Sequence, residues 1–379
     1  MSLTTFIDQP QDPTGTLVVV FLRGGADGLN MVVPHGDDGY YRARPGIGIR
    51  RENLLELDGF FGLNPNLAAL HPWWKEGQLS ISHCAGSEDE TRSHFEAQDF
   101  MEHGGLAAGG WLGRFLRSRP DAGHSPLTAV AIGPQLPECL RGAPSCAAIQ
   151  SLEDFGLGER VPPGFLPQLS ALYKSAPGVL GPAGQNALAA LDRINALTKT
   201  TYTPAYAADY QKDGFAAGLL QVARLIKGRV GLQAATLDLG GWDSHITQSV
   251  IMDPPMQRLS KGLHAFATDL GKDELARTNI VVLTEFGRRV AENSAAGTDH
   301  GRGSVMFHLG GGLSGGNKVG VDWPDLTKST LVGPGDLPVN HNYRDILAPV
   351  LRKQSPRVDL AKVFPGHQPA ESTKRMAGG

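Results

Sequence analysis

The stretch NIVVLTEFGRRVAENSAAGTDHGRGSVMFHLGGG, residues 279–312, decides the fold that we expect for this chain. It holds two apolar runs, residues 280–283 and 304–309, of the kind found in strands that are buried on both faces of a sheet. Acidic and basic residues follow the first run, and an Asp-His pair precedes the second. Ligands of open α/β sheets bind outside the carboxyl ends of the strands. The stretch therefore predicts a buried sheet with a site at its edge, although two ordinary polar surface loops would look similar.

Two other apolar runs end in the same way. Residues 16–22 lead through a glycine-rich turn to Asp27, and residues 234–239 lead through another to Asp243 and His245. Glycines permit tight turns with positive φ and close approach of the backbone to a ligand. Asp27 either caps a helix or belongs to a site, and Asp243 and His245 form either an ordinary loop pair or ligands of a shared ion. We expect these two runs and the first run of the opening stretch to be neighbours in one sheet.

Ser93 lies between a polar segment and a helical pattern. With Glu96 three residues later, it has the spacing of a capping box. A hydroxyl in this position also lies among free N–H groups that favour an anion, so it suits a nucleophile that attacks a phosphate or sulfate ester. Arg92 and His94 flank Ser93 and would add charge. Both interpretations of Ser93 stay open at this point.

The remaining segments complete an α/β pattern. Further strands are predicted at residues 78–83 and 127–132, and helices at residues 66–74, 215–227, 256–270 and 341–351. Residues 151–210 show helical spacing among Pro-Gly breaks without a compact group of His, Asp or Glu, which indicates a helical insertion or cap. We therefore expect a single α/β domain over residues 16–351 and a C-terminal tail over residues 352–379.

Composition narrows the function classes. The 379 residues are 41% hydrophobic and 19% charged, with a net charge of −3 and no basic tract, which argues against a nucleic-acid partner. No apolar segment reaches the roughly 18–20 residues that span a bilayer, so we expect a soluble chain. Three cysteines are too few for a disulfide framework, although Cys139 and Cys146 are close enough in sequence to pair. The absence of a G-x-G-x-x-G fingerprint disfavours a nucleotide cofactor.

Five blocks of the sequence, in a fixed order, resemble a bacterial family, the domain of unknown function 1501 family, which is placed within the alkaline phosphatase/sulfatase superfamily. The blocks are VVVFLRGGADGLN, RSHFEAQDF, LDLGGWDSHITQ, VVLTEFGRR and GTDHGRGSVMFHLGGG. The resemblance extends from about residue 16 to residue 351. It implies an alkaline phosphatase-like, three-layer α/β/α sandwich with a mostly parallel central sheet. Many relatives carry a twin-arginine export leader, and none is visible here.

The resemblance also implies roles for particular residues. Superfamily members bind metal ions through acidic and imidazole groups at the sheet edge, and the matching candidates here are Asp27, Asp243, His245, Glu285, Asp299 and His300. The candidate catalytic residues are Ser93 as nucleophile and Arg92, His94, Arg288 and Arg302 as charged partners of the anionic group. Phe286 stands where the superfamily has a histidine. Arg288 or Arg302 is therefore an alternative source of positive charge in a site without metal.

We expect the chain to be a metal-dependent hydrolase of phosphate or sulfate esters. Its cofactor would be Zn²⁺, Mn²⁺ or Mg²⁺, and its partner a small anionic ester or a glycan. The alternative is a divergent, non-catalytic member that binds an anionic or glycan ligand in the same cleft. Under either hypothesis Asp27, Asp243, His245, Glu285 and His300 should converge on one pocket, since parallel strands bring their carboxyl ends to one edge.

Overall fold

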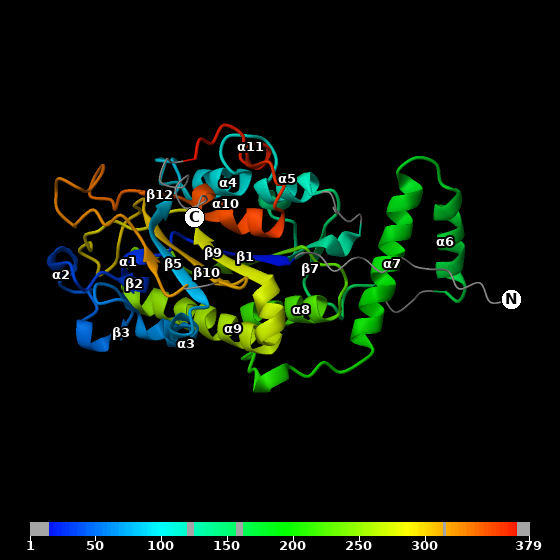
Figure 1. Ribbon diagram of the computed structural model, residues 1–379, viewed down its shortest axis with the longest axis horizontal. Coiled ribbons are helices and arrows are strands. Elements are labelled where there is room, and N and C mark those ends of the chain that lie inside the picture. Colours follow the sequence, from blue (N-terminus) through cyan, green and yellow to red (C-terminus); the bar gives the residue numbers. More distant parts are fainter. Residues whose placement is uncertain (1–14, 120–124, 157–161, 314–315, 370–379) are drawn as a thin grey trace.

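The structure is a computed structural model that describes residues 15–119, 125–156, 162–313 and 316–369. The first 14 residues and the last ten, at the end of the predicted tail, lie outside the described residues. The described chain is a mixed α/β structure in which helices cover both faces of a central, mostly parallel sheet (Figure 1). The predicted α/β class is confirmed at this level.

The central sheet has nine strands among the described residues, and every strand except β10 runs in the same direction. Their order is β11-β5-β10-β9-β1-β8-β6-β7, with β12 also paired to β5. The strands are β1 (Thr16–Arg23), β5 (Leu79–Gly86), β6 (Ala129–Ile132), β7 (Ala147–Ile149), β8 (Ala234–Gly240), β9 (Thr278–Thr284), β10 (Ser304–Gly310), β11 (Val319–Gly320) and β12 (His341–Asn342). The predicted neighbours β8, β1 and β9 lie side by side, so that prediction is confirmed. A small second sheet has the order β2-β4-β3, with β2 (Val32–Val33), β4 (Gly62–Leu63) and β3 (Leu55–Glu56).

Both faces of the central strands are buried because apolar side chains occupy consecutive positions. Val18 and Val20 of β1 face the core beneath α8 (Gly214–Lys227) and α9 (Gln248–Arg277). Leu17 and Val19 face the opposite core, beneath α4 (His94–His103), α5 (Trp111–Ser118) and α10 (Tyr343–Gln354). Figure 1 shows these two groups of helices on opposite sides of the sheet. The chain therefore forms three layers, helix, sheet and helix.

A helical hairpin lies where the sequence predicts an insertion or cap. Helices α6 (Phe165–Ser175) and α7 (Leu180–Thr198) project from the end of the sheet (Figure 1). No residue of α6 is buried, whereas Ala190, Leu191 and Ile194 of α7 are. Only the inner part of α7 therefore joins the main core. Whether residues 16–351 behave as one domain stays a prediction.

Packed structure continues past residue 351 into the segment where a tail is predicted. Helix α10 ends at Gln354, and the short helix α11 (Leu360–Val363) follows. The side chains of Val363 and Phe364 are buried in the core beneath α5. A helix of one turn has no sequence periodicity, so this segment carried no signal of order.

The three cysteines all lie among the described residues and are free, so the pairing of Cys139 with Cys146 does not occur. None of the described helices combines the length and the apolar character that crossing a membrane requires.

Sheet direction places several loops at one edge. The loops after β1, β5, β8 and β9 leave the carboxyl ends of strands that run the same way. Because β10 is antiparallel to β9 and β5, its amino end lies at that same edge. Residues that follow four strands and residues that precede a fifth are thereby brought together.

Candidate functional site

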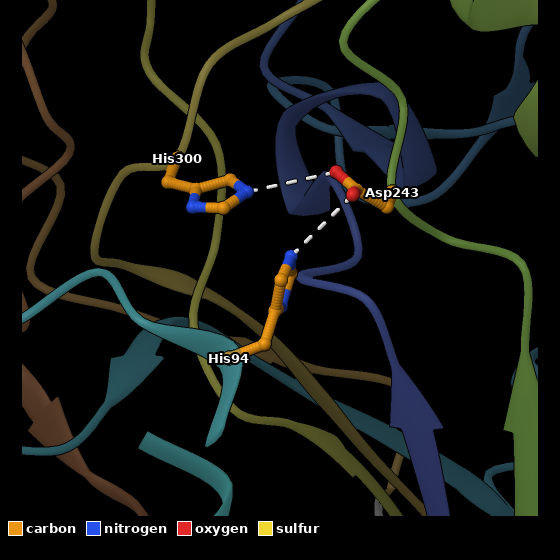
Figure 2. Close-up of side chains that lie close together, drawn as sticks. All are labelled: His94, Asp243 and His300. Atoms are coloured by element: carbon orange, nitrogen blue, oxygen red, sulfur yellow. Dashed lines mark ion pairs between the residues drawn. The ribbon is translucent and has the colours of Figure 1, made fainter. Parts of the chain in front are cut away.

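Three side chains meet at this edge, and Figure 2 shows them pointing toward one another. His94 comes from the first turn of α4, Asp243 from the loop after β8, and His300 from the loop before β10. One nitrogen or carboxylate oxygen of each lies within 4.8 Å of the others. The Nε2 atoms of His94 and His300 each lie 3.6 Å from an Asp243 carboxylate oxygen. All three side chains are partly exposed, so the group is accessible to a ligand.

His245 adds a third imidazole. Its Nε2 lies 3.2 Å from Asp243 Oδ1 and 2.9 Å from His300 Nε2. We call His94, Asp243, His245 and His300 the imidazole cluster. Its members come from three separate segments, which only the folded sheet brings together.

Acceptors behind two of the rings fix the position of their protons. His94 Nδ1 lies 2.7 Å from Glu285 Oε1, and His300 Nδ1 lies 2.8 Å from the carbonyl oxygen of Arg92. A carboxylate and a carbonyl only accept hydrogen bonds, so each Nδ1 carries a hydrogen and each Nε2 of the neutral ring bears a lone pair. Burial, the largest influence, lowers the pKa of His300 although the Arg92 carbonyl raises it, and this favours its neutral ring.

The Nε2 of His94 is buried and has no hydrogen-bond partner in the described part of the chain. It faces the Asp243 carboxylate, so two electron-pair donors lie 3.6 Å apart. Such a pair is stable only when a proton or a cation lies between its members. In a tetrahedral site with Zn–N bonds of 2.0–2.1 Å, neighbouring donor atoms are about 3.3 Å apart. The cluster therefore fits a single divalent cation, and its nitrogen-rich donors suit Zn²⁺ or Mn²⁺ better than Mg²⁺.

Glu285, a predicted metal ligand, lies behind His94. Its side chain is 1% exposed and accepts hydrogen bonds from His94 Nδ1, Gln98 Nε2 and the Gly24 amide. Burial alone would raise the pKa of Glu285, but these hydrogen bonds outweigh it and the pKa is lowered. An ionised Glu285 orients the His94 ring and makes its Nε2 a stronger electron-pair donor. Residues behind a metal ligand have this role in metalloproteins.

Arg288 holds Asp243 in place. Its buried guanidinium lies 2.7 Å from Asp243 Oδ1 and also donates to the carbonyl groups of Gly24, Gly25 and Thr298. Burial alone would raise the pKa of Asp243, but the hydrogen bond and charge of Arg288 lower it. Because its donors are engaged within the protein, Arg288 positions the loops rather than offering a free clamp for an anionic substrate.

Asp299, another predicted metal ligand, lies behind His245. Its Oδ1 is 3.5 Å from His245 Nδ1 and accepts a hydrogen bond from Asn293 Nδ2 at 3.3 Å. The Asn293 bond is the main reason why the pKa of Asp299 is lowered, with His245 and Arg289 adding to it against partial burial. Asp299 thus lies behind His245 as Glu285 lies behind His94, but at a longer distance, 3.5 Å against 2.7 Å, and with a more exposed carboxylate.

Asp27 is not brought into the cluster. Its fully buried carboxylate is paired with the buried guanidinium of Arg44, at 2.5 Å to Oδ2 and 3.0 Å to Oδ1. Gln248 Nε2 donates to the same carboxylate at 2.5 Å. A permanent cation therefore occupies the position that the sequence suggests for a metal ion. Arg44 was not predicted because it lies in residues 36–66, where the sequence shows no periodicity.

Ser93 begins α4 as expected, but its side chain makes no capping hydrogen bond, so of the two interpretations of Ser93 the capping box with Glu96 is not formed. Arg92 has a left-handed φ of 55°, a strained conformation for a non-glycine residue. This turn aims the Arg92 carbonyl at His300, while its guanidinium donates to the buried carboxylate of Asp336. Arg92 thus acts on the cluster through its backbone, and the Ser93 hydroxyl is left for another partner.

Arg302 lies beside the cluster rather than in it. Its Nη1 is 2.7 Å from Glu90 Oε1, and the Glu90 side chain is 71% exposed. The Nε of Arg302 is buried without a hydrogen-bond partner in the described chain. Of the three arginines predicted as clamps, Arg302 has the most exposed acidic partner, since the side chain of Asp243 is 49% exposed and that of Asp336 is buried.

Phe286 forms an apolar wall of the cluster at the position where the resemblance implies a histidine. Its ring stacks on His94, with centroids 4.9 Å apart, and lies 4.9 Å from the ring of His300. The close fit requires Gly25, which has a φ of +63° and whose added Cβ would lie 2.5 Å from the Phe286 ring. The phenyl ring therefore packs against two imidazoles of the cluster.

One comparison with known proteins identifies a family. The family model described as "Protein of unknown function (DUF1501)" matches residues 160–351, just over half of the chain. No curated protein matches the chain. The matched segment contains Asp243, His245 and His300 of the imidazole cluster, together with Glu285 and Arg288 behind them. The chain belongs to this DUF1501 family.

Proposed function

We propose that this protein is a metal-dependent hydrolase of phosphate or sulfate esters, of the alkaline phosphatase/sulfatase type. The observation that carries the proposal is the unpartnered, buried Nε2 of His94 facing the Asp243 carboxylate. His300 and His245 supply two further imidazoles to the same place. When bound there, a divalent cation supplies polarisation of an ester oxygen and offsets negative charge on the substrate.

The nucleophile in this proposal is Ser93. Its hydroxyl is at the N-terminus of a ten-residue helix, next to His94 in sequence, and makes no capping bond. The first amides of a helix have no acceptor within the helix, and they favour an anion. An ester group held by these amides would present its phosphorus or sulfur atom to Ser93 Oγ. Phe286 would exclude water from one side of that group.

One observation favours the alternative of a non-catalytic ligand-binding protein. Arg288 already neutralises Asp243, and Arg44 already neutralises Asp27, so the site has permanent cations without any metal ion. In that case His94 would carry a second proton between Glu285 and Asp243, and the cluster would bind an anion or a glycan without cleaving it.

Metal binding and turnover together distinguish these functions. The metal-free protein would be titrated with Zn²⁺, Mn²⁺ and Mg²⁺ by calorimetry, and then assayed with 4-nitrophenyl phosphate and 4-nitrophenyl sulfate. We expect one ion per chain and turnover of at least one ester, both lost in His94→Ala. The matched control is His264→Ala, since His264 lies on α9 and bonds to Trp73, away from the cluster. Absence of divalent-ion binding near neutral pH would sink the hydrolase and leave the arginine-compensated binding site.

A further inference from the structure

A pocket of about 590 Å³ is bordered by the chain segment that follows His245 of the imidazole cluster. Its walls come from the loop after His245, the start of α9 and the segment that follows β1. Thr247 and Gln248 line it, and they are two and three residues from His245. Two extended residues span no more than about 7 Å, so the pocket begins within that distance along the chain from a cluster ligand.

The segment that leads from His245 to the pocket is firmly held. Asn293 donates to the His245 carbonyl and to Asp299, while the Thr247 and Gln248 amides donate to the carbonyls of residues 295 and 296. Thr247 has a φ of 39°, which is rare for a β-branched residue. This turn directs the chain from the cluster into the pocket, so both lie on one fixed piece of backbone.

The chemistry of the pocket differs from that of the cluster. Its lining holds no Lys, Arg or His, and its one acidic residue is Asp253. Apolar side chains contribute much of the remainder, namely Ile47, Ile49, Val250, Met252 and Met256. An anionic group entering this pocket would lose water and meet no cation. An uncharged group would bury apolar surface there at no such cost.

Polar contacts in the pocket are few but available. The side-chain amides of Asn30, Asn64 and Gln248 are already bonded to neighbouring protein groups. In the described chain, the hydroxyls of Thr247 and Ser249 have no hydrogen-bond partner, and both residues are exposed. The pocket therefore offers an apolar surface with hydroxyl groups at its mouth.

We propose that this pocket binds the alcohol portion of the substrate and selects esters whose alcohol is uncharged and partly apolar. This inference rests on the proposed hydrolase, and it names the substrate class of the same site. The anionic ester group lies at the cluster and at the N-terminus of α4, and the neutral alcohol extends past His245 toward Val250. Esters whose alcohol carries a second negative charge are poor ligands.

The test measures binding of the alcohol alone, so it needs neither metal nor turnover. The probes are 2-fluorophenol and 3-fluoro-4-hydroxybenzoate, which differ by one carboxylate, and their dissociation constants are measured by fluorine NMR with the full chain. We expect the neutral phenol to bind at least about fivefold more tightly, since one uncompensated charge costs on the order of 1 kcal/mol or more. Val250→Lys should reduce or reverse that preference by supplying a cation.

A matched control exists in Val179→Lys. Val250 is 72% exposed in the pocket wall, and Val179 is 88% exposed beside the projecting hairpin of α6 and α7. Neither change disturbs the core, so both variants should fold, and Val179→Lys should leave the preference unchanged. Equal binding of the two probes, or equal effects of the two variants, overturns the alcohol pocket. Selective binding without turnover of any ester would instead retain the pocket and reject the hydrolase.

Discussion

At the scale of single residues, the role of an acidic group at this site depends on which side chain it contacts. Glu285 and Asp299 have the residue type of metal ligands, yet each points at the Nδ1 of a histidine. A ring held in this way presents Nε2 to the cluster. Residue type and strand position were enough to predict that these acids are near the site. They did not show that a histidine ring lies between each acid and the centre of the cluster, because that arrangement depends on side-chain packing.

The first prediction concerns Glu285. Glu285→Gln replaces an ionised acceptor by a neutral amide and weakens the bond that orients His94, so affinity for Zn²⁺ should fall roughly 10–100-fold. Calorimetric titration of the metal-free protein measures this change. The control is Glu274→Gln, a partly buried glutamate paired with Arg229 at the end of α9. Equal affinities of the two variants would show that Glu285 does not support a metal ligand.

At the scale of elements, two helices begin with different N-cap chemistry. The Asp213 side chain accepts from the amides of Phe215 and Ala216 at the start of α8, whereas Ser93 makes no such bond at the start of α4. An N-cap hydrogen bond stabilises a protein by about 0.5–2 kcal/mol. Of these two helices, only α8 is therefore stabilised by a side-chain cap.

The second prediction compares these caps. Asp213→Ala should lower the free energy of unfolding by about 1 kcal/mol, while Ser93→Ala should change it by less than about 0.5 kcal/mol. Urea unfolding monitored by circular dichroism measures both values. Ester turnover should nevertheless be lost in Ser93→Ala and kept in Asp213→Ala. A Ser93→Ala protein that is as active as the wild type excludes Ser93 as nucleophile, whatever its stability.

Strands were predicted more successfully than the loops between them, for physical reasons. The apolar runs that became β1, β8 and β9 are buried on both faces, so their composition alone distinguishes them. The antiparallel direction of β10 has no such signature, although it is what brings His300 to the site. Arg44 lies in a segment without periodicity, and only the folded chain shows that it pairs with Asp27.

At the scale of the whole molecule, the cluster depends on segments 206 positions apart, from residue 94 to residue 300, since 300 − 94 = 206. The unfolded chain cannot gather these ligands, so a bound ion stabilises only the folded state. The third prediction is that Zn²⁺ at 100 times its dissociation constant adds about 2.7 kcal/mol to the free energy of unfolding. His94→Ala should remove this increment and His264→Ala should retain it. Thermal unfolding with and without the ion measures the difference, and an increment that survives His94→Ala places the ion elsewhere.

The last prediction is that acid destabilises the fold through His83. This side chain is fully buried in β5, and both ring nitrogens are engaged in the neutral form. Nε2 donates to the Val32 carbonyl at 3.0 Å, and Nδ1 accepts from the Cys84 amide at 2.9 Å. Burial lowers the pKa of His83 from 6.5 to about 4, against smaller influences of the Val32 bond and the Asp27 charge that raise it. A proton added to the ring would therefore have no acceptor in the folded protein.

The sign of the effect follows from the two states. Below pH 6.5 the unfolded chain binds a proton at His83 that the folded chain refuses until about pH 4, so stability is lost as pH falls across that window. The loss is about 1.4 kcal/mol per pH unit. His83→Gln can still donate to Val32 and accept from Cys84 but does not titrate, so its stability should fall less between pH 7 and pH 5 than that of the wild type. Urea unfolding at both pH values, with metal removed by chelator, measures this difference, and His71→Gln makes the same exchange at a less buried position. Parallel losses in wild type and His83→Gln would show that His83 is not the group that makes the fold sensitive to acid.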